Sequence, residues 1–154
     1  MARDVWMVDQ RGCLSPVALY VQKKGEVSPK EFAGLVVEAL QKLYKKDNIA
    51  PRRDIASFAA SQSLQNRLVI QNIVIKGFNH PPPVFSALRP IQKYLQCVAL
   101  ECHPKKRKTI AEQLSQLGVN RICRAGTMQI PPVTWHHDGK PNLASWIHWA
   151  DLEE

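Results

Sequence analysis

Residues 4–22 read DVWMVDQRGCLSPVALYVQ, and they join a polar turn to the start of a predicted strand. Gly12 and Pro16 bracket Cys13, and the apolar run 17–22 behind them predicts a buried strand. A cysteine between two such residues is well placed to expose its sulfur at the end of a sheet, as thiolate chemistry requires. Most single cysteines instead fill small gaps in a core. The pattern alone leaves both roles open for Cys13.

The length and composition of the chain predict one globular domain. It has 154 residues, of which 45% are hydrophobic and 22% charged, so a disordered chain is not indicated. No apolar run approaches the roughly 18 residues of a membrane span, and the N-terminus lacks the charged-then-apolar pattern of a signal peptide. We expect a single domain over residues 1–154, in the cytoplasm and without a membrane span.

The net charge is +8 and the pI is about 9.5, which favours polyanionic partners. The basic residues are nevertheless spread over separate turns and helix ends, and no aromatic side chains interleave with them as in a base-stacking surface. They are Lys23-Lys24, Lys45-Lys46, Arg52-Arg53 and Lys105 to Lys108. The pattern favours a phosphate-rich small molecule, such as coenzyme A or a dinucleotide, over nucleic acid.

Four cysteines, Cys13, Cys97, Cys102 and Cys123, are too few and too irregularly placed for a disulfide framework. Reduced thiols fit the cytosol. A zinc site would need Cys97, Cys102, Cys123 and His103, but no Cys-x-x-Cys pair is present, and Cys97 and Cys123 fall in predicted strands. We therefore predict no metal site.

Helix and strand patterns alternate along the rest of the chain. Ser28-Pro29-Lys30-Glu31 is a capping box with proline at the first helical position. The helix that it opens runs to residues 44–46, with an apolar face made of Phe32, Leu35, Val36, Ala39, Leu40 and Leu43.

Gly118 stands where a helix C-cap belongs, between a predicted helix and a predicted strand. This helix–glycine–strand unit is typical of α/β domains, so we predict an α/β fold whose mostly parallel sheet carries helices on its faces. The other predicted elements are a helix tail over 1–8, a helix over 54–65, a strand over 68–75, a proline-rich loop over 77–84, a short helix over 85–94, a strand over 95–101, a helix over 105–117 and a strand over 119–123.

Residues 124–143 show little periodicity and are predicted to form a long loop, a common place for functional residues. The loop contains Trp135, His136, His137 and Asp138, which form a candidate substrate loop. An equally good reading is that they only attach the loop to the body, because histidine suits both structural and proton-transfer roles. A helix or strand over 143–152 would close the chain, anchored by Trp146 and Trp149.

Two motifs resemble one known family. DQRGCLSP (9–16), followed by a strand, is similar to the active-site segment of LuxC-like long-chain acyl-CoA reductases, a branch of the aldehyde dehydrogenase superfamily. GVNRICRAGTMQIPPVTWHHDGKPNL (118–143), with WADLE (149–153) behind it, is similar to the C-terminal signature of that family. The resemblance implies a fold like the aldehyde dehydrogenase catalytic domain, with helices on both faces of the sheet. It also implies Cys13 as the nucleophile that forms an acyl-enzyme thioester from long-chain acyl-CoA, with NADPH as the reductant.

The same resemblance implies that backbone N–H groups at Cys13 and Leu14, in the tight turn after Gly12, stabilise the oxyanion. It also implies that the dinucleotide-binding domain precedes these residues and is absent from this chain. The chain has no G-x-G-x-x-G array, and residues 68–95 lack the glutamate that binds the cofactor ribose in related enzymes. The expected partner is then a separate N-terminal nucleotide-binding chain or a second copy. The alternatives are a truncated, non-catalytic homologue that binds acyl groups or a partner, and, from charge alone, a nucleic-acid-binding module.

Overall fold

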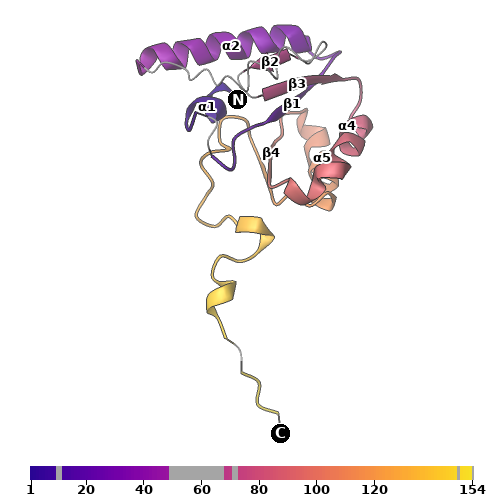
Figure 1. Cartoon of the computed structure of the whole chain (residues 1–154). Coiled ribbons are helices and arrows are strands. Elements are labelled where there is room, and N and C mark those ends of the chain that lie inside the picture. The colour runs from indigo at the N-terminus through magenta and orange to yellow at the C-terminus, as the bar shows by residue number, and fades with distance from the viewer. Residues whose placement is uncertain (10–11, 49–67, 71–72, 149, 154) are drawn as a thin grey trace.

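The computed structural model describes residues 1–9, 12–48, 68–70, 73–148 and 150–153 (Figure 1). The α-helices are α1 (Ala2–Trp6), α2 (Pro29–Lys46), α4 (Pro82–Leu88) and α5 (Pro104–Gln116). The strands are β1 (Ala18–Gln22), β2 (Leu68–Ile70), β3 (Ile73–Phe78), β4 (Cys97–Ala99) and β5 (Arg121–Cys123). Short 3-10 turns are η1 (Arg89–Tyr94), η2 (His137–Gly139) and η3 (Ala144–Trp146). The predicted helix over 54–65 lies outside the described residues.

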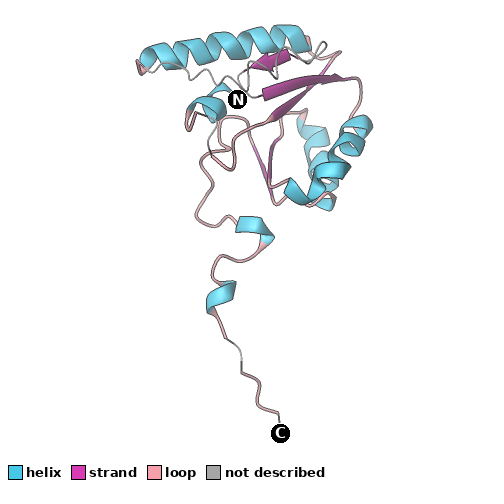
Figure 2. Cartoon of the chain, in the orientation of Figure 1, coloured by secondary structure: helices cyan, strands magenta, loops and turns pink. Residues whose placement is uncertain are grey.

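The described strands form two small sheets (Figure 2). In the first, β3 lies between β1, which is parallel to it, and β2, which is antiparallel. In the second, β4 and β5 pair in parallel, with Cys97 opposite Arg121. The mixture of helices with short parallel pairs is consistent with an α/β fold. Two of the three described strand pairings are parallel, but the prediction of one sheet is wrong for the described residues, because their strands divide between two sheets.

The antiparallel strand β2 lies within residues 68–75, for which the sequence predicts a single strand. The apolar run over residues 68–75 is interrupted by the polar pair Gln71-Asn72, and Ile70 pairs with Ile73 in antiparallel register. A run that reverses direction pairs with itself, so β2 and β3 form a hairpin in place of a single strand. β1 confirms the predicted strand to within one residue, but its residues are half-buried rather than buried, and Val17 before it is 71% exposed.

α2 begins as the sequence predicts. The Ser28 side chain accepts from the Glu31 N–H at 3.2 Å, and the Glu31 carboxylate accepts from the Ser28 N–H at 2.7 Å. Its buried stripe is Ala33, Val36, Leu40 and Tyr44, which packs with Val5 of α1 and with Ile73 and Ile75 of β3. Leu35, predicted on the apolar face, is 53% exposed, because a helix over so small a sheet is covered only along a narrow stripe.

A second core cluster lies around α4 and α5. Its buried members are Leu88, Leu114, Leu117 and Val119, and Tyr20 of β1 packs at its edge. Gly118, with φ +86°, ends α5 in the left-handed conformation, which confirms the predicted C-cap. The cluster holds β4 and β5 beside the first sheet, and the segment that leaves β5 reaches back to α1.

The sequence predicts a proline-rich loop over residues 77–84, but the prolines of residues 81–83 do not prevent a helix from starting there. Pro82 opens α4, where the missing N–H has no helical partner in any case. The expected closing element with a Trp146 anchor is also wrong, since only the short turn η3 forms and Trp146 is 82% exposed. Trp149 lies outside the described residues. After η2 the chain runs away from both sheets (yellow in Figure 1). Among the described helices, none is long and apolar enough to cross a bilayer.

Candidate functional site

Cys13 lies in a tight turn between α1 and β1. The turn Gly12–Ser15 is closed by a 2.9 Å hydrogen bond from the Ser15 N–H to the Gly12 carbonyl oxygen. Its two central residues differ in environment, because the Leu14 side chain is buried whereas Cys13 is exposed. Within the described part of the chain, no hydrogen bond uses the backbone N–H of either residue. The arrangement therefore presents a thiol with two backbone donors beside it.

Gly12 lies at a close approach to two other side chains. A Cβ on Gly12 would lie 2.9 Å from Gln129 Oε1 and 3.0 Å from Val8 Cγ2, so the Gln129 amide would have to shift to make room for it. The turn is thus pressed against the side chain of Gln129. Gln129 belongs to the second motif (118–143), so a residue far along the chain contacts the turn that carries the first motif (9–16).

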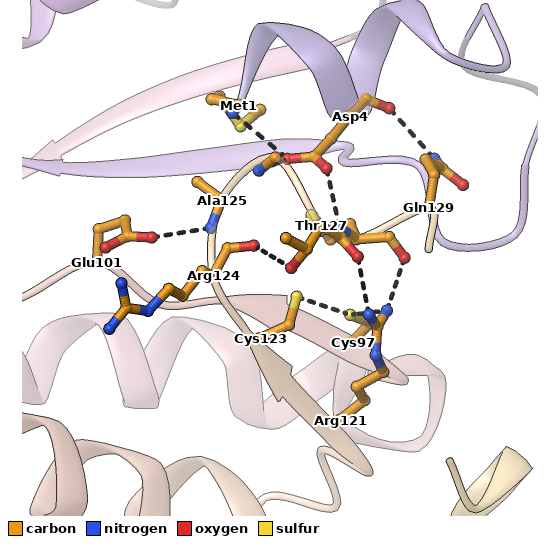
Figure 3. Close-up of polar contacts among 12 residues, drawn as sticks. Met1, Asp4, Cys97, Glu101, Arg121, Cys123, Arg124, Ala125, Thr127 and Gln129 are labelled. Atoms are coloured by element: carbon orange, nitrogen blue, oxygen red, sulfur yellow. Dashed lines mark hydrogen bonds and ion pairs between the residues drawn. The ribbon is translucent and has the colours of Figure 1, made fainter. Parts of the chain in front are cut away.

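Gln129 joins three segments through its side-chain amide. Its Nε2 donates to Ser15 Oγ at 2.9 Å. It also donates to the Asp4 carbonyl oxygen at 3.2 Å (Figure 3). Because the amide assignment follows from this network, the oxygen is the atom that faces Gly12. Sequence reasoning missed Gln129, because a glutamine among residues without periodicity carries no local signal.

The segment around Gln129, residues 124–130, is held from two sides by buried charges. Asp4 is fully buried, and its carboxylate accepts from the Gly126 N–H and, at 2.9 Å, from the Met128 N–H. The Arg121 guanidinium donates to the carbonyl oxygens of Thr127, Met128 and Ile130. Figure 3 shows the two side chains approaching this segment from α1 and from β5. The only sequence signal for Asp4 is that an acid stands directly before an apolar run.

The candidate substrate loop lies at the other end of β4 and β5. The Trp135 ring lies 5.7 Å from the Arg121 guanidinium and 5.0 Å from the His137 ring. Asp138 accepts from Gln96 Nε2 at 3.0 Å and lies 3.0 Å from His137 Nδ1, in an exposed pair. His136 is exposed. In the described structure, no hydrogen bond, ion pair or ring contact joins this loop to the Cys13 turn, so its role stays a prediction.

Two other cysteines meet away from that turn. Cys97 Sγ and Cys123 Sγ lie 3.9 Å apart on neighbouring strands, and Arg121 Nη1 lies 3.6 Å from Cys97 Sγ. Burial, followed by the neighbouring Cys123 thiol, raises the pKa of Cys97 to about 12, although Arg121 opposes the shift. The described residues contain no group of three His, Cys, Asp or Glu side chains placed to hold a metal ion.

Among the described residues, the N-termini of α2 and α5 do not fit a nicotinamide dinucleotide. Such a cofactor binds its pyrophosphate at a glycine-rich turn between a strand and a helix N-terminus. At α2, the Glu31 N–H already donates to the Ser28 side chain, and the Glu31 carboxylate occupies the same end. At α5, the cap is His103, whose Nδ1 accepts from the Lys105 N–H at 3.3 Å, and the preceding residues 100–102 contain no glycine.

One family model matches the chain. It is described as Acyl-CoA reductase (LuxC), and it matches in two segments, residues 1–79 and residues 55–149. The two segments overlap and together contain both motifs, including the Cys13 turn and residues 124–143. Residues 55–79 lie in both matched segments. No curated protein matches the chain.

Proposed function

This chain belongs to the LuxC family of acyl-CoA reductases, and we propose that it performs the acyl-transfer half of that reaction with Cys13 as the nucleophile. The substrate is a long-chain acyl-CoA, and the product of this half-reaction is an acyl-enzyme thioester plus free coenzyme A. The observation that carries the proposal is the exposed Cys13 at the centre of a turn whose backbone donors are free in the described structure. Thiolate nucleophiles need both exposure and a stabilised product charge.

The chemistry follows from the turn. The Cys13 thiolate attacks the thioester carbonyl, a new C–Sγ bond forms, and negative charge develops on the carbonyl oxygen. The N–H groups of Cys13 and Leu14 then donate to that oxygen. One donor of this kind is worth about a factor of 10²–10³ in rate in other acyl-transfer enzymes. As the tetrahedral intermediate collapses, the C–S bond to coenzyme A breaks, and the proton released by Cys13 ends on the coenzyme A thiol.

The complete reaction, reduction of the acyl group to a fatty aldehyde, needs a hydride donor, which by family is NADPH. Because the N-termini of α2 and α5 do not fit a dinucleotide, we derive no step through it. We propose that this chain is one catalytic domain of aldehyde dehydrogenase type, the C-terminal portion of the reductase. The nucleotide-binding part then comes from outside these residues, as a separate chain or through association with a second copy.

We retain residues 135–138 as the candidate substrate loop. Four residues separate the loop from the segment 124–130, which touches the Cys13 turn through Gln129. We also place the reaction in the cytosol, where the four free thiols would stay reduced.

The test is acylation without turnover. The protein is incubated with palmitoyl-CoA labelled in its acyl group, and the label is located by peptide mass spectrometry. We expect label on Cys13, release of free coenzyme A, and no label in Cys13→Ala. Cys102→Ala is the matched control, because Cys102 is also a free thiol but lies outside the turn, and it should label like wild type. Unlabelled wild type, or a labelled Cys13→Ala, would contradict the proposal.

The caps at the start of α2 and α5, which leave no usual dinucleotide site there, favour one alternative, a truncated homologue that binds acyl groups or a partner without transferring them. It predicts that a non-hydrolysable acyl-CoA analogue or a fatty acid binds to the protein while Cys13 stays unmodified. The same experiment therefore separates the two functions, because only the enzyme releases coenzyme A.

A further inference from the structure

Gln129 is the side chain that links the two motifs. Its amide touches Ser15 on one side and Asp4 on the other, and its oxygen lies against Gly12. The contact with Ser15 spans 114 residues of sequence, so it connects the segment after β5 directly to the turn that carries Cys13. Gln129 is partly buried, which strengthens its hydrogen bonds relative to those of a surface amide.

We propose that Gln129 is a positioning residue, whose amide holds the Cys13 turn in the one conformation that places the Cys13 and Leu14 N–H groups beside the thiol. The importance of this for acyl transfer rests on the proposed function, whereas the effect on the turn itself does not. The turn has a single internal hydrogen bond, from Ser15 to Gly12, so it depends on outside contacts to stay in place. Gln129 supplies one such contact at Ser15 and another at Gly12, the two ends of the turn.

Gln129 can position the Cys13 turn because the backbone beside Gln129 is fixed by hydrogen bonds of its own. Asp4 and Arg121 use the backbone N–H and C=O of Met128, the residue directly before it. A side chain on a segment fixed in this way loses little conformational entropy when it orders its neighbour. The buried Asp4 carboxylate and the Arg121 guanidinium thus act on the Cys13 turn through Gln129, without touching Cys13.

The variants follow from this geometry. Gln129→Met keeps the length of the side chain but removes the amide, and Ser15→Ala removes the hydroxyl that accepts from it. Gln113→Met is the matched control, because Gln113 is an exposed residue on α5. Thermal unfolding of each variant shows whether the fold survives. If Gln129→Met does not fold, Ser15→Ala tests the same contact from the other side.

The first measurement needs no substrate. Hydrogen exchange of the Ser15 amide, followed by NMR, reports how often the turn opens. We expect exchange about tenfold faster in Gln129→Met and in Ser15→Ala, the factor for losing roughly one net hydrogen bond, and unchanged exchange in Gln113→Met. Unchanged exchange in both test variants would overturn the inference, whether or not the protein transfers acyl groups.

The second measurement compares two reactions of the same thiol. Alkylation of Cys13 by iodoacetamide needs only an exposed sulfur, whereas acylation by palmitoyl-CoA needs the oxyanion donors as well. We expect Gln129→Met to slow acylation by about tenfold or more and to change alkylation by less than about threefold. Equal slowing of both reactions, or of neither, would show that Gln129 is only structural. If wild type takes no acyl group, the proposed function fails, and the amide exchange alone decides the positioning role.

Discussion

Cys13 and Cys97 show how strongly surroundings decide what a thiol can do. Cys13 is exposed in a turn whose backbone donors have no partner among the described residues, whereas Cys97 is half-buried beside a second thiol. Burial and the neighbouring Cys123 raise the pKa of Cys97 to about 12. At pH 8, roughly one Cys97 side chain in 10⁴ is then a thiolate, and the thiolate is the reactive species. The two cysteines should therefore differ greatly in reactivity within the same protein.

Alkylation measures this difference. With iodoacetamide at pH 8, we expect Cys13 to be modified at least about 100-fold faster than Cys97, because Cys97 is protonated and shielded. Peptide mass spectrometry over a time course gives each rate separately. In urea both sites should react at similar rates, which is the internal control. Comparable rates for Cys97 and Cys13 in the folded protein would contradict the environment that the structure gives them.

At the scale of single residues, the sequence predicts the roles of some side chains and misses those of others, for a physical reason. Gly12 and Pro16, which act on their own neighbours, favour an exposed Cys13, and the structure has Cys13 exposed. Gln129 and Asp4 act across 114 and 122 residues, on Ser15 and Gly126, and no local pattern encodes such a contact. What a side chain does locally can thus be predicted from the sequence, whereas its partner in another segment cannot.

At the scale of elements, the same distinction holds. The capping box of α2 was predicted in full because all of its hydrogen bonds lie within four successive residues. The prolines before α4 were read as a loop because proline excludes the interior of a helix but not its first turn, and the sequence does not say which applies. The division of the strands into two sheets depends on pairing between distant segments, so it too was beyond local reasoning.

The capping box gives a stability prediction. Ser28→Ala removes the acceptor for the Glu31 N–H at the start of an 18-residue helix that covers the first sheet. We expect the free energy of unfolding to fall by about 1 kcal/mol, the usual cost of losing a cap. Urea unfolding measures it, with Lys30→Ala as the control, because Lys30 lies in the same turn and is exposed. Equal losses in both variants would show that the cap adds nothing beyond helix propensity.

Glu31 makes the same cap depend on pH. The hydrogen bonds from the Ser28 backbone and then its side chain lower the pKa of Glu31 from its usual 4.5. A lowered pKa means that the ionised carboxylate stabilises the fold above pH 4.5 and that this contribution disappears as the pH falls through the lowered value. Wild type should therefore be more stable than Glu31→Ala at pH 7, and the difference should shrink between pH 4.5 and pH 2. A difference that stays constant over that range, measured by urea unfolding at each pH, would exclude the charged cap.

On the scale of the whole molecule, α1 closes the fold by connecting the first core cluster to the segment that follows β5. Val5 is fully buried in the first core cluster, and Asp4 beside it holds the segment that follows β5. One short helix thus serves both the core and the candidate site. The extended segment around Trp146 takes no part in this closure, as the exposure of that side chain shows, so the site depends on the body of the molecule.

This closure can be tested at Asp4. Asp4→Asn keeps the size of the side chain but replaces one carboxylate oxygen with a donor, which then faces the Gly126 or Met128 N–H. A buried pair of donors without an acceptor costs about 1–3 kcal/mol, so we expect the free energy of unfolding to fall by that amount. Glu112→Gln, an equivalent change at an exposed position on α5, should cost almost nothing. Because Gln129 depends on the same segment, hydrogen exchange of the Ser15 amide should also accelerate in Asp4→Asn. Loss of stability without that acceleration would mean that the segment and the Cys13 turn are held independently.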